Sequence, residues 1–301
     1  MPNSNLIQEA ILLTLAYSDI FSTPLTFSAL HQRLIGYRTT RSQLRQTLDK
    51  LLQQGRLEFH QPYYHLPGRK AIIATFTHKQ SLSLAKKRFA QSLAQKLALF
   101  PSIIAIYLTG SLAVDNASSR DDIDFLIITQ PHTLWTTRFF LNLILDVFQL
   151  RRRPRQTEST TNKLCLNLFL TSQSLSLPRA KRNLHSAYEL IQLKPLIEKQ
   201  PLLPLIYQHN PWLKSYLPNF NFPSPSSFPL PSPFLHLNFL EPLLFRLQRL
   251  YMTSRLTHEL IHPQYAFFHP RSLQPLITQQ LHQQALRYNI TIWPQLRLFL
   301  T

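Results

Sequence analysis

Residues 103–129 read IIAIYLTGSLAVDNASSRDDIDFLIIT, which is two apolar runs joined by a polar connection. The runs 103–108 and 125–129 are short and rich in β-branched residues, so each predicts a buried β-strand. A third run at 164–170 predicts another strand, and helices are predicted at 81–100 and 134–150. Helix, strand, turn, strand, helix, strand is the order of a small mixed sheet, so the sequence predicts an α+β fold.

Two carboxylates open the second predicted strand. Alternate residues of a strand share a face, so Asp122 and Asp124 project together while Ile123 and Phe125 point into the core. Adjacent carboxylates repel each other unless a cation lies between them. Magnesium prefers one or two carboxylates together with substrate phosphates, so the pair predicts a Mg²⁺ site. The alternative is a pair that caps exposed amides at the strand start; Asp121 is expected to be a solvated neighbour.

The turn Thr109-Gly110-Ser111 follows the first predicted strand. A residue without Cβ lets backbone amides approach a phosphate closely, and a hydroxyl can bond the phosphate oxygens. We therefore expect these three residues to hold the phosphates of a nucleoside triphosphate beside the aspartates. A metal ion there would neutralise developing charge and orient an incoming hydroxyl for attack on the α-phosphorus.

This arrangement resembles the polymerase-β-like nucleotidyltransferase superfamily. Its signature is glycine, then serine or glycine, nine to thirteen residues, then Asp, an apolar residue, and Asp or Glu. Here ten residues separate Ser111 from Asp122, and the resemblance extends over about residues 80–190. It implies a nucleotidyltransferase fold and transfer of a nucleoside monophosphate from a Mg²⁺-bound triphosphate to an unidentified hydroxyl. More narrowly, the chain resembles bacterial proteins that join a winged-helix segment to such a domain.

The sequence departs from that pattern on the third strand. The superfamily usually has a third acid there, which completes the metal site and can act as the catalytic base. The matching residue in this chain is Asn167, which offers a neutral oxygen without charge or basicity. Glu158 and Asp146 are the candidate substitutes. The alternative function is therefore a catalytically weakened, nucleotide-sensing regulator that binds nucleic acid; a third is a structural interaction module.

Several cations are candidates to contact a nucleotide. Arg138, one turn into the helix predicted at 134–150, and Lys163, just before the third strand, are expected to reach a phosphate; each is equally well explained as a surface residue. The run RRRPR at 151–155 suits a triphosphate or an RNA backbone. It suits equally well the negative end of the preceding helix dipole.

Residues 1–70 predict a winged-helix domain. Helices are predicted at 6–21, 26–34 and 40–54, with glycines at 36 and 55 near their ends, followed by a β-hairpin around Gln61-Pro62. Arg41, Arg45 and Lys50 would lie on the recognition helix and contact RNA or DNA. Such folds also dock proteins, so that alternative stays open.

The remaining chain divides into three expected parts. Residues 71–210 are expected to form the nucleotidyltransferase domain, with helices at 182–193 and 195–207. Residues 211–236 are rich in Pro and Ser and are expected to be a linker. Residues 237–301 are expected to be a helical segment, with helices at 240–261 and up to about 288 around a turn at 262–270.

The composition limits the partners and the location. The formal charge is +18, which attracts polyanions such as nucleic acid, nucleotides and anionic lipid, although a basic proteome would show the same bias. A single cysteine, Cys165, excludes an internal disulfide framework and fits the cytoplasm. The twelve histidines show no helical H-x-x-x-H spacing, so no zinc site is expected. No apolar stretch approaches the roughly 20 residues that span a bilayer, and no secretory signal is recognised, so we expect a soluble protein with no membrane partner.

Overall fold

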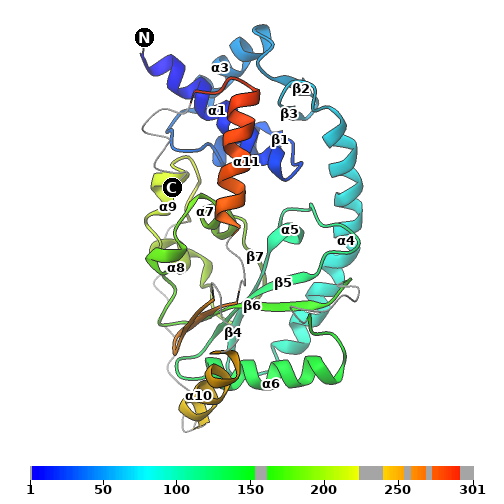
Figure 1. Ribbon diagram of the computed structural model, residues 1–301, viewed down its shortest axis with the longest axis vertical. Coiled ribbons are helices and arrows are strands. Elements are labelled where there is room, and N and C mark those ends of the chain that lie inside the picture. Colours follow the sequence, from blue (N-terminus) through cyan, green and yellow to red (C-terminus); the bar gives the residue numbers. More distant parts are fainter. Residues whose placement is uncertain (1, 153–160, 224–239, 254–258, 269–272, 292–301) are drawn as a thin grey trace.

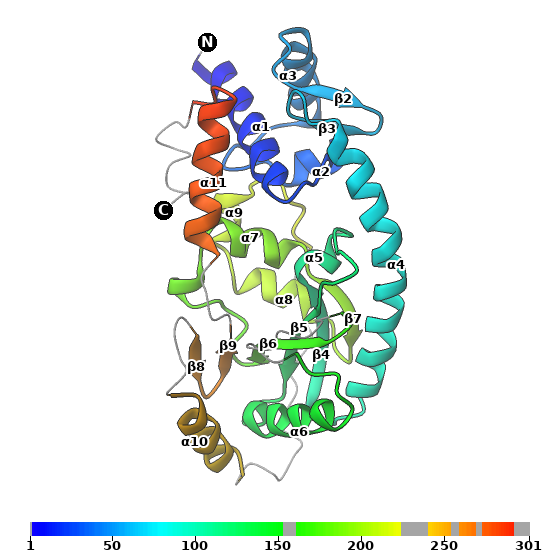
Figure 2. The ribbon, with the colours of Figure 1, turned by 45° about the vertical axis from the view of Figure 1, so that its right-hand side comes forward.

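The computed structural model describes residues 2–152, 161–223, 240–253, 259–268 and 273–291 (Figures 1 and 2). It is a mixed α+β structure with one sheet of three strands and one of six, so the predicted fold class is confirmed at that level. Glu158, Arg153, Arg155 and residues 224–236 of the expected linker lie outside the described residues.

The first seventy residues contain three helices and a small antiparallel sheet with the strand order β1-β3-β2. Thr40 begins the third helix with a capping box, in which its hydroxyl accepts from Gln43 N and the Gln43 side chain accepts from Thr40 N. Gly55 follows this helix at φ +65°, a left-handed conformation that favours glycine. The elements are α1 (Pro2–Ile20), β1 (Leu25–Thr26), α2 (Phe27–Gln32), α3 (Arg41–Gln53), β2 (Glu58–His60) and β3 (Tyr63–His65).

A long helix, α4 (Ala71–Leu97), runs along one side of the molecule from the N-terminal elements to the large sheet (Figure 2). It begins ten residues before the start predicted from the sequence. Residues 71–80 contain no glycine or proline, and Ile72 and Phe76 are buried at helical spacing. The burial of these two side chains therefore stabilises a helix that begins before residue 81.

The six-stranded sheet has the order β7-β4-β5-β6-β9-β8. Only the pair β5 and β6 is parallel, and α6 (Leu134–Val147) forms the crossover that parallel strands require. Every residue of β4 is buried, which explains its continuous apolar sequence. The strands are β4 (Ile103–Thr109), β5 (Ile123–Thr129), β6 (Leu164–Thr171), β7 (Lys194–Glu198), β8 (Leu260–His262) and β9 (Tyr265–Phe267).

Three of these strands fall where the sequence predicted a helix or a turn, and the predictions are wrong for those residues. In other parts of the same predicted ranges, α8 (Leu203–Gln208) and α10 (Leu240–Thr253) confirm helix. β7 lies in the helix predicted at 195–207, and β8 and β9 form a hairpin at the end of the helix predicted at 240–261 and in the following turn. Each strand has three to five residues, too few to show a clear period. Pairing of β7 with β4 and of β9 with β6 gives these segments their extended conformation.

In chain order, the shorter helices are α5 (Gly110–Ala113), the 3₁₀ turn η1 (Arg179–Lys181), α7 (Leu184–Ile191), α8 (Leu203–Gln208) and α9 (Leu213–Tyr216). Among them, α5 contacts β4 and β5, and α7 contacts α9. Asn219, in the expected linker, accepts a hydrogen bond from Thr39 N at 2.8 Å and donates to the Tyr37 carbonyl at 2.6 Å. The described part of that segment therefore packs on the N-terminal elements.

The two C-terminal helices lie at opposite ends of the molecule (Figure 1). α10 (Leu240–Thr253) packs against α6, whereas α11 (Gln274–Arg287) packs against α1. One hydrophobic core joins residues of α1, α3, α7 and α11. The two described C-terminal helices therefore pack on different parts of the fold, α10 on α6 and α11 on the N-terminal elements. Within the described ranges, no helix combines the length and the apolar character needed to cross a membrane.

A buried carboxylate of α10 caps the first turn of α6. Thr133 at the helix start makes no side-chain cap. Instead, the two carboxylate oxygens of Glu241 accept hydrogen bonds from Trp135 N at 2.7 Å and Thr136 N at 2.8 Å. A carboxylate at this position accepts from helix amides that have no partner within the helix and offsets the positive end of the helix dipole.

We predict that Glu241→Ala lowers the free energy of unfolding by about 1.5–3 kcal/mol, because charge-assisted hydrogen bonds to buried amides are lost. Glu241→Gln keeps one acceptor oxygen and should lose less. Urea denaturation followed by circular dichroism measures both. Leu243→Ala, at an exposed position of the same helix, is the control, and an equal loss in that variant would contradict the capping role.

Candidate functional site

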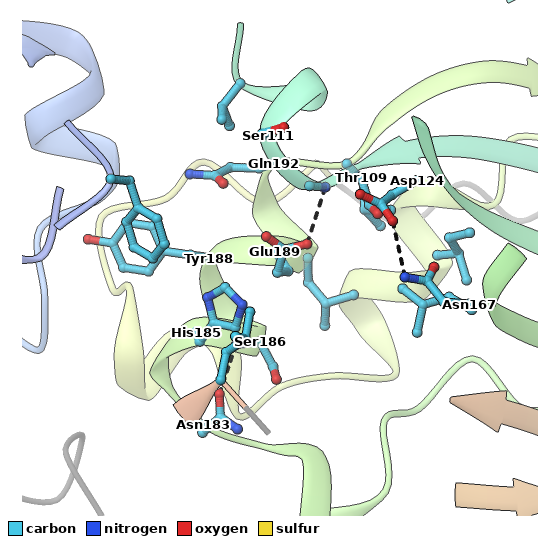
Figure 3. Close-up of a pocket in the computed structure, with 18 of the residues that line it drawn as sticks. Thr109, Ser111, Asp124, Asn167, Asn183, His185, Ser186, Tyr188, Glu189 and Gln192 are labelled. Carbon is cyan, nitrogen blue, oxygen red and sulfur yellow. Dashed lines mark hydrogen bonds between the residues drawn. The ribbon is translucent and has the colours of Figure 1, made fainter. Parts of the chain in front are cut away.

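A cavity of about 480 Å³ lies where the ends of β4, β5 and β6 meet α7 and the end of α1 (Figure 3). The two carboxylates that line it, those of Asp124 and Glu189, lie toward the sheet, and apolar, aromatic and further polar side chains line the rest. The lining residues nearest Asp124 include Thr109, Gly110, Ser111, Asn167 and Glu189. The predicted phosphate turn and one of the two predicted metal-binding aspartates therefore open on the same space.

Gly110 lies in direct contact with Asp124. Thr109 and Asp124 are register partners across β4 and β5, so the turn after β4 passes over the Asp124 side chain. Gly110 has φ +67°, and a Cβ built on it would lie 2.7 Å from Asp124 Oδ2. Both the conformation and the space thus require glycine here.

Asp121 organises the connection between the turn and β5. Its carboxylate accepts hydrogen bonds from Ser111 Oγ at 3.1 Å, Ser118 N at 2.9 Å and Ser118 Oγ at 2.5 Å. Burial acts to raise the pKa of Asp121, but the Ser118 and Ser111 hydrogen bonds hold that pKa below its ordinary value. Asp121 is therefore a structural anchor of the loop, in contrast to the solvated neighbour expected from the sequence.

Three side chains lie close together here, those of Asp122, Asp124 and Cys165. One ligand atom of each lies within 4.8 Å of the others. A cation, Arg152 from the basic run, occupies the open side, where its Nη1 donates to Asp122 Oδ2 at 2.7 Å. Burial and the charges of Asp124 and Asp122 raise the pKa of Cys165, so its thiol stays protonated near neutral pH.

Two further side chains contact the centre from β6 and α7. Asn167 Nδ2 donates to Asp124 Oδ1 at 3.1 Å, and Gly110 N donates to Glu189 Oε2 at 3.3 Å (Figure 3). Glu189 was missed in the sequence, where its one signal is an isolated acid between Tyr188 and Leu190. It lies across the turn from Asp124 and adds a third carboxylate to the site.

The charge of the site is unbalanced. Burial, followed by the charges of Asp122 and Glu189, raises the pKa of Asp124 from 3.8 to about 7, against the opposing effects of Arg152 and of the Asn167 hydrogen bond. Three carboxylates thus face one guanidinium at this end of the cavity. Such an arrangement attracts an additional cation, because the negative charges repel each other at short range.

The structure places several predicted residues elsewhere. Arg138 lies between α6 and α10, where Nη1 donates to Gln248 Oε1 at 2.6 Å and the guanidinium lies 4.0 Å from the Phe268 ring; burial lowers its pKa to about 9. Lys163 accepts a backbone hydrogen bond from Ile123 N at 2.9 Å. Neither residue lines the cavity. Asp146, a candidate third acid, pairs with Arg151 at 2.7 Å.

An aromatic wall closes the other side of the cavity. The rings of Tyr17 and Tyr188 lie 4.3 Å apart, and Tyr17 Oη lies 3.2 Å from His185 Nδ1. Phe21 stacks on His185 at 6.1 Å. These residues come from the end of α1 and from α7, so the N-terminal elements help to build the cavity.

Comparisons with protein-family models, with curated proteins and with solved structures found no match to the chain. The features of the chain that bear on its function are therefore the geometry of this site and the resemblance in Gly110, Ser111, Asp122 and Asp124. The structure places Gly110 against Asp124 through the β4–β5 pairing, with Ser111 lining the same cavity and Asp122 close to Asp124. It adds Glu189 and Arg152 to them.

We predict that Gly110→Ala disturbs the site beyond the cost of its backbone conformation. A left-handed alanine costs about 1–2 kcal/mol, and the new methyl group would also displace the Asp124 carboxylate. Gly55→Ala is a matched control, because its φ is +65° and nothing lies within 4 Å of the added Cβ. Thermal denaturation should show a larger loss for Gly110→Ala than for Gly55→Ala. Equal losses would show that the Asp124 side chain moves aside without cost.

We predict a pH-dependent contribution of Asp124 to stability in protein freed of metal by a chelator. Its pKa is about 7 in the folded chain and near 3.8 when unperturbed, so the folded state retains a proton that the unfolded chain loses between these values. The contribution is complete below pH 4 and is lost as the pH rises through 7. Relative to wild type, Asp124→Asn should therefore become more stable from pH 5 to pH 8 in urea denaturation. The exposed Asp49→Asn is the control, and identical pH profiles for all three proteins would refute the prediction.

Proposed function

We propose that the chain transfers a nucleoside monophosphate from a Mg²⁺-bound nucleoside triphosphate to a hydroxyl acceptor. The observation that carries this proposal is the contact between the Gly110 turn and Asp124 at the polar end of the cavity. The turn offers amides and a hydroxyl for phosphate, and the carboxylates offer ligands for the cation that accompanies it. Both components of a metal–triphosphate site thus meet at one place.

The topology supports a nucleotidyltransferase fold for residues 71–210. β4 and β5 are antiparallel, β6 follows as the parallel neighbour of β5, and the site residues occupy adjacent ends of these strands. The order helix, strand, helix, helix, hairpin in residues 1–70 similarly supports the winged-helix assignment. The proposal for the whole chain is a nucleotidyltransferase domain with a winged helix that contributes Tyr17 and Phe21 to the cavity.

The residues present fit magnesium. Asp122 and Asp124 supply oxygen atoms, which a hard cation prefers, and the repulsion between these carboxylates and Glu189 is relieved by positive charge. Gly110 leaves open the space beside Asp124 Oδ2 that any other residue would fill. When bound, Mg²⁺ would be held by Asp122 and Asp124 and would neutralise charge on the triphosphate.

Three side chains have separate roles in the proposed reaction. Glu189 accepts the proton of the acceptor hydroxyl, whose oxygen forms a bond to the α-phosphorus as the bond to the bridging oxygen breaks and pyrophosphate leaves. Asn167 keeps Asp124 oriented through its Nδ2–H, which donates to Oδ1 at 3.1 Å. Arg152, now bound to Asp122, offers a planar guanidinium suited to phosphate oxygens.

A nucleotide-sensing, nucleic-acid-binding regulator is the second candidate. Arg152 and Asn167 already donate hydrogen bonds to Asp122 and Asp124. These bonds hold the two carboxylates in position whether or not the site catalyses a reaction. On the expected recognition helix, Arg45 lies over the Phe27 ring at 4.3 Å and donates to Tyr64 Oη at 3.2 Å. Arg41 lies over the same ring at 5.3 Å. Arg41, Arg45 and Lys50 are all exposed on this helix, so each is open to a polyanion.

The deciding experiment incubates the full chain with Mg²⁺ and each α-labelled triphosphate, with and without RNA, and measures labelled product and pyrophosphate. Nucleotide binding is measured in parallel by calorimetry. Product formation that requires Asp122 and Asp124 supports the transferase. Mg²⁺-dependent binding without product supports the regulator, and unchanged affinity in a folded Asp122→Asn, Asp124→Asn variant shows that nucleotide binds elsewhere.

We predict that Glu189→Gln lowers the transfer rate about 10²–10⁴-fold, the usual contribution of a general base, while Mg²⁺-dependent triphosphate affinity changes little. Asn167→Asp in that background should recover part of the rate, because it places a carboxylate against the other oxygen of Asp124. Exposed Asp49→Asn is the control. A wild-type rate in Glu189→Gln would assign the base to another group.

A further inference from the structure

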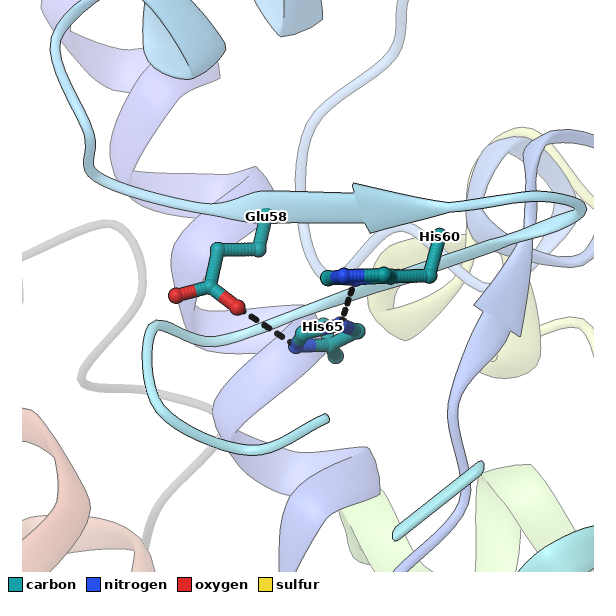
Figure 4. Close-up of side chains that lie close together, drawn as sticks. All are labelled: Glu58, His60 and His65. Atoms are coloured by element: carbon teal, nitrogen blue, oxygen red, sulfur yellow. Dashed lines mark hydrogen bonds and ion pairs between the residues drawn. The ribbon is translucent and has the colours of Figure 1, made fainter. Parts of the chain in front are cut away.

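Three metal-ligating side chains share one face of the β2–β3 hairpin, at the N-terminal end of α4 (Figure 4). Glu58 and His60 are two residues apart on β2 and therefore project from the same face. His65 on β3 is the register partner of Glu58. One ligand atom of each side chain lies within 4.8 Å of the others. The hairpin thus brings a carboxylate and two imidazoles together.

Hydrogen bonds fix the protonation of His65. Its side chain is buried, and its Nδ1 lies 2.8 Å from the carbonyl oxygen of Leu66. A carbonyl oxygen only accepts, so Nδ1 carries a proton, and in the neutral ring Nε2 presents a lone pair. Nε2 faces His60 Nδ1 at 2.9 Å. Metal-binding histidines usually donate their other ring N–H to a carbonyl or a carboxylate, so His65 already has the tautomer and orientation of a ligand.

We propose that Glu58, His60 and His65 form a Zn²⁺ site. Zinc binds nitrogen and oxygen ligands tetrahedrally at about 2.0–2.1 Å, which places two nitrogens about 3.4 Å apart. The observed distance of 2.9 Å therefore needs the two rings to separate by only about half an ångström. The ion replaces the proton between them, and His60 binds through Nδ1 with its own proton on Nε2. Water completes the fourth position.

Glu58 makes the larger adjustment. One carboxylate oxygen accepts from Gly68 N at 3.0 Å, and the other lies 3.8 Å from His65 Nδ1. The side chain is 39% exposed, so it can rotate toward the ion without disturbing the core. As a ligand it offsets one of the two positive charges of zinc, which two neutral imidazoles leave uncompensated.

The hairpin site is separate from the carboxylates of the cavity. None of its three residues lines that cavity, and its two imidazoles favour zinc over the magnesium proposed for the aspartates. A zinc ion would join β2 to β3 next to Leu66 and Gly68, which lead into α4. Its expected role is to stabilise the hairpin.

The test titrates the full chain, first freed of metal by a chelator, with Co²⁺ and then Zn²⁺. Tetrahedral Co²⁺ absorbs visible light more strongly than the hydrated ion, so we expect such a spectrum and its loss when Zn²⁺ is added. His60→Ala and Glu58→Gln should each weaken Zn²⁺ binding at least about tenfold. His78→Ala, at an exposed position on α4, is the matched control and should bind as wild type.

A second control separates the two metal sites. The Asp122→Asn, Asp124→Asn variant should retain the hairpin affinity for Zn²⁺, and circular dichroism establishes that each variant is folded. A wild-type Co²⁺ spectrum typical of octahedral geometry, or equal Zn²⁺ affinity in His60→Ala and wild type, would overturn the proposal. The triad would then be a hydrogen-bonded network. Loss of binding only in the aspartate variant would also overturn it, because the ion would belong to the cavity.

Discussion

The carboxylates of Asp124, Asp122 and Glu189 repel one another, and the residues around them reduce this repulsion. The turn after β4 contributes Gly110, whose missing side chain leaves room for the Asp124 carboxylate, and β6 contributes the amide of Asn167. The guanidinium of Arg152 neutralises one of the three charges. Burial raises the pKa of Asp124 to about 7, so a proton relieves part of what remains. The same imbalance makes the site suited to a divalent cation, and so connects its electrostatics with the proposed chemistry.

Local pattern was sufficient to predict the centre of the sheet. The apolar runs of β4, β5 and β6, the glycine turn and the spacing of the two aspartates all lie within short segments whose structure is determined by neighbours in the chain. The capping box at Thr40 belongs to the same class. Asn167 could be placed on its strand for the same reason, because a strand fixes which residues share a face.

Features that depend on distant segments could not be predicted in this way. Glu189 lies at the site because α7 packs over the turn after β4. Arg138 lies away from the site, where Gln248 of α10 accepts its hydrogen bond. The edge strands β7, β8 and β9 are defined by the strands they join. The triad of Glu58, His60 and His65 has no helical spacing. Only the hairpin register, which pairs Glu58 with His65, brings it together.

The packing of α11 on α1 has a consequence for how the protein is made. Glu9 accepts a hydrogen bond from Thr291 N at 2.7 Å, and Gln284 donates to Asp19 at 3.0 Å. Closing contacts over such long stretches of chain carries an entropic cost and slows folding. During synthesis on the ribosome, the face of α1 that meets α11 stays uncovered until the last of these residues emerges. That apolar face of the nascent chain therefore stays exposed to solvent until α11 has been synthesised.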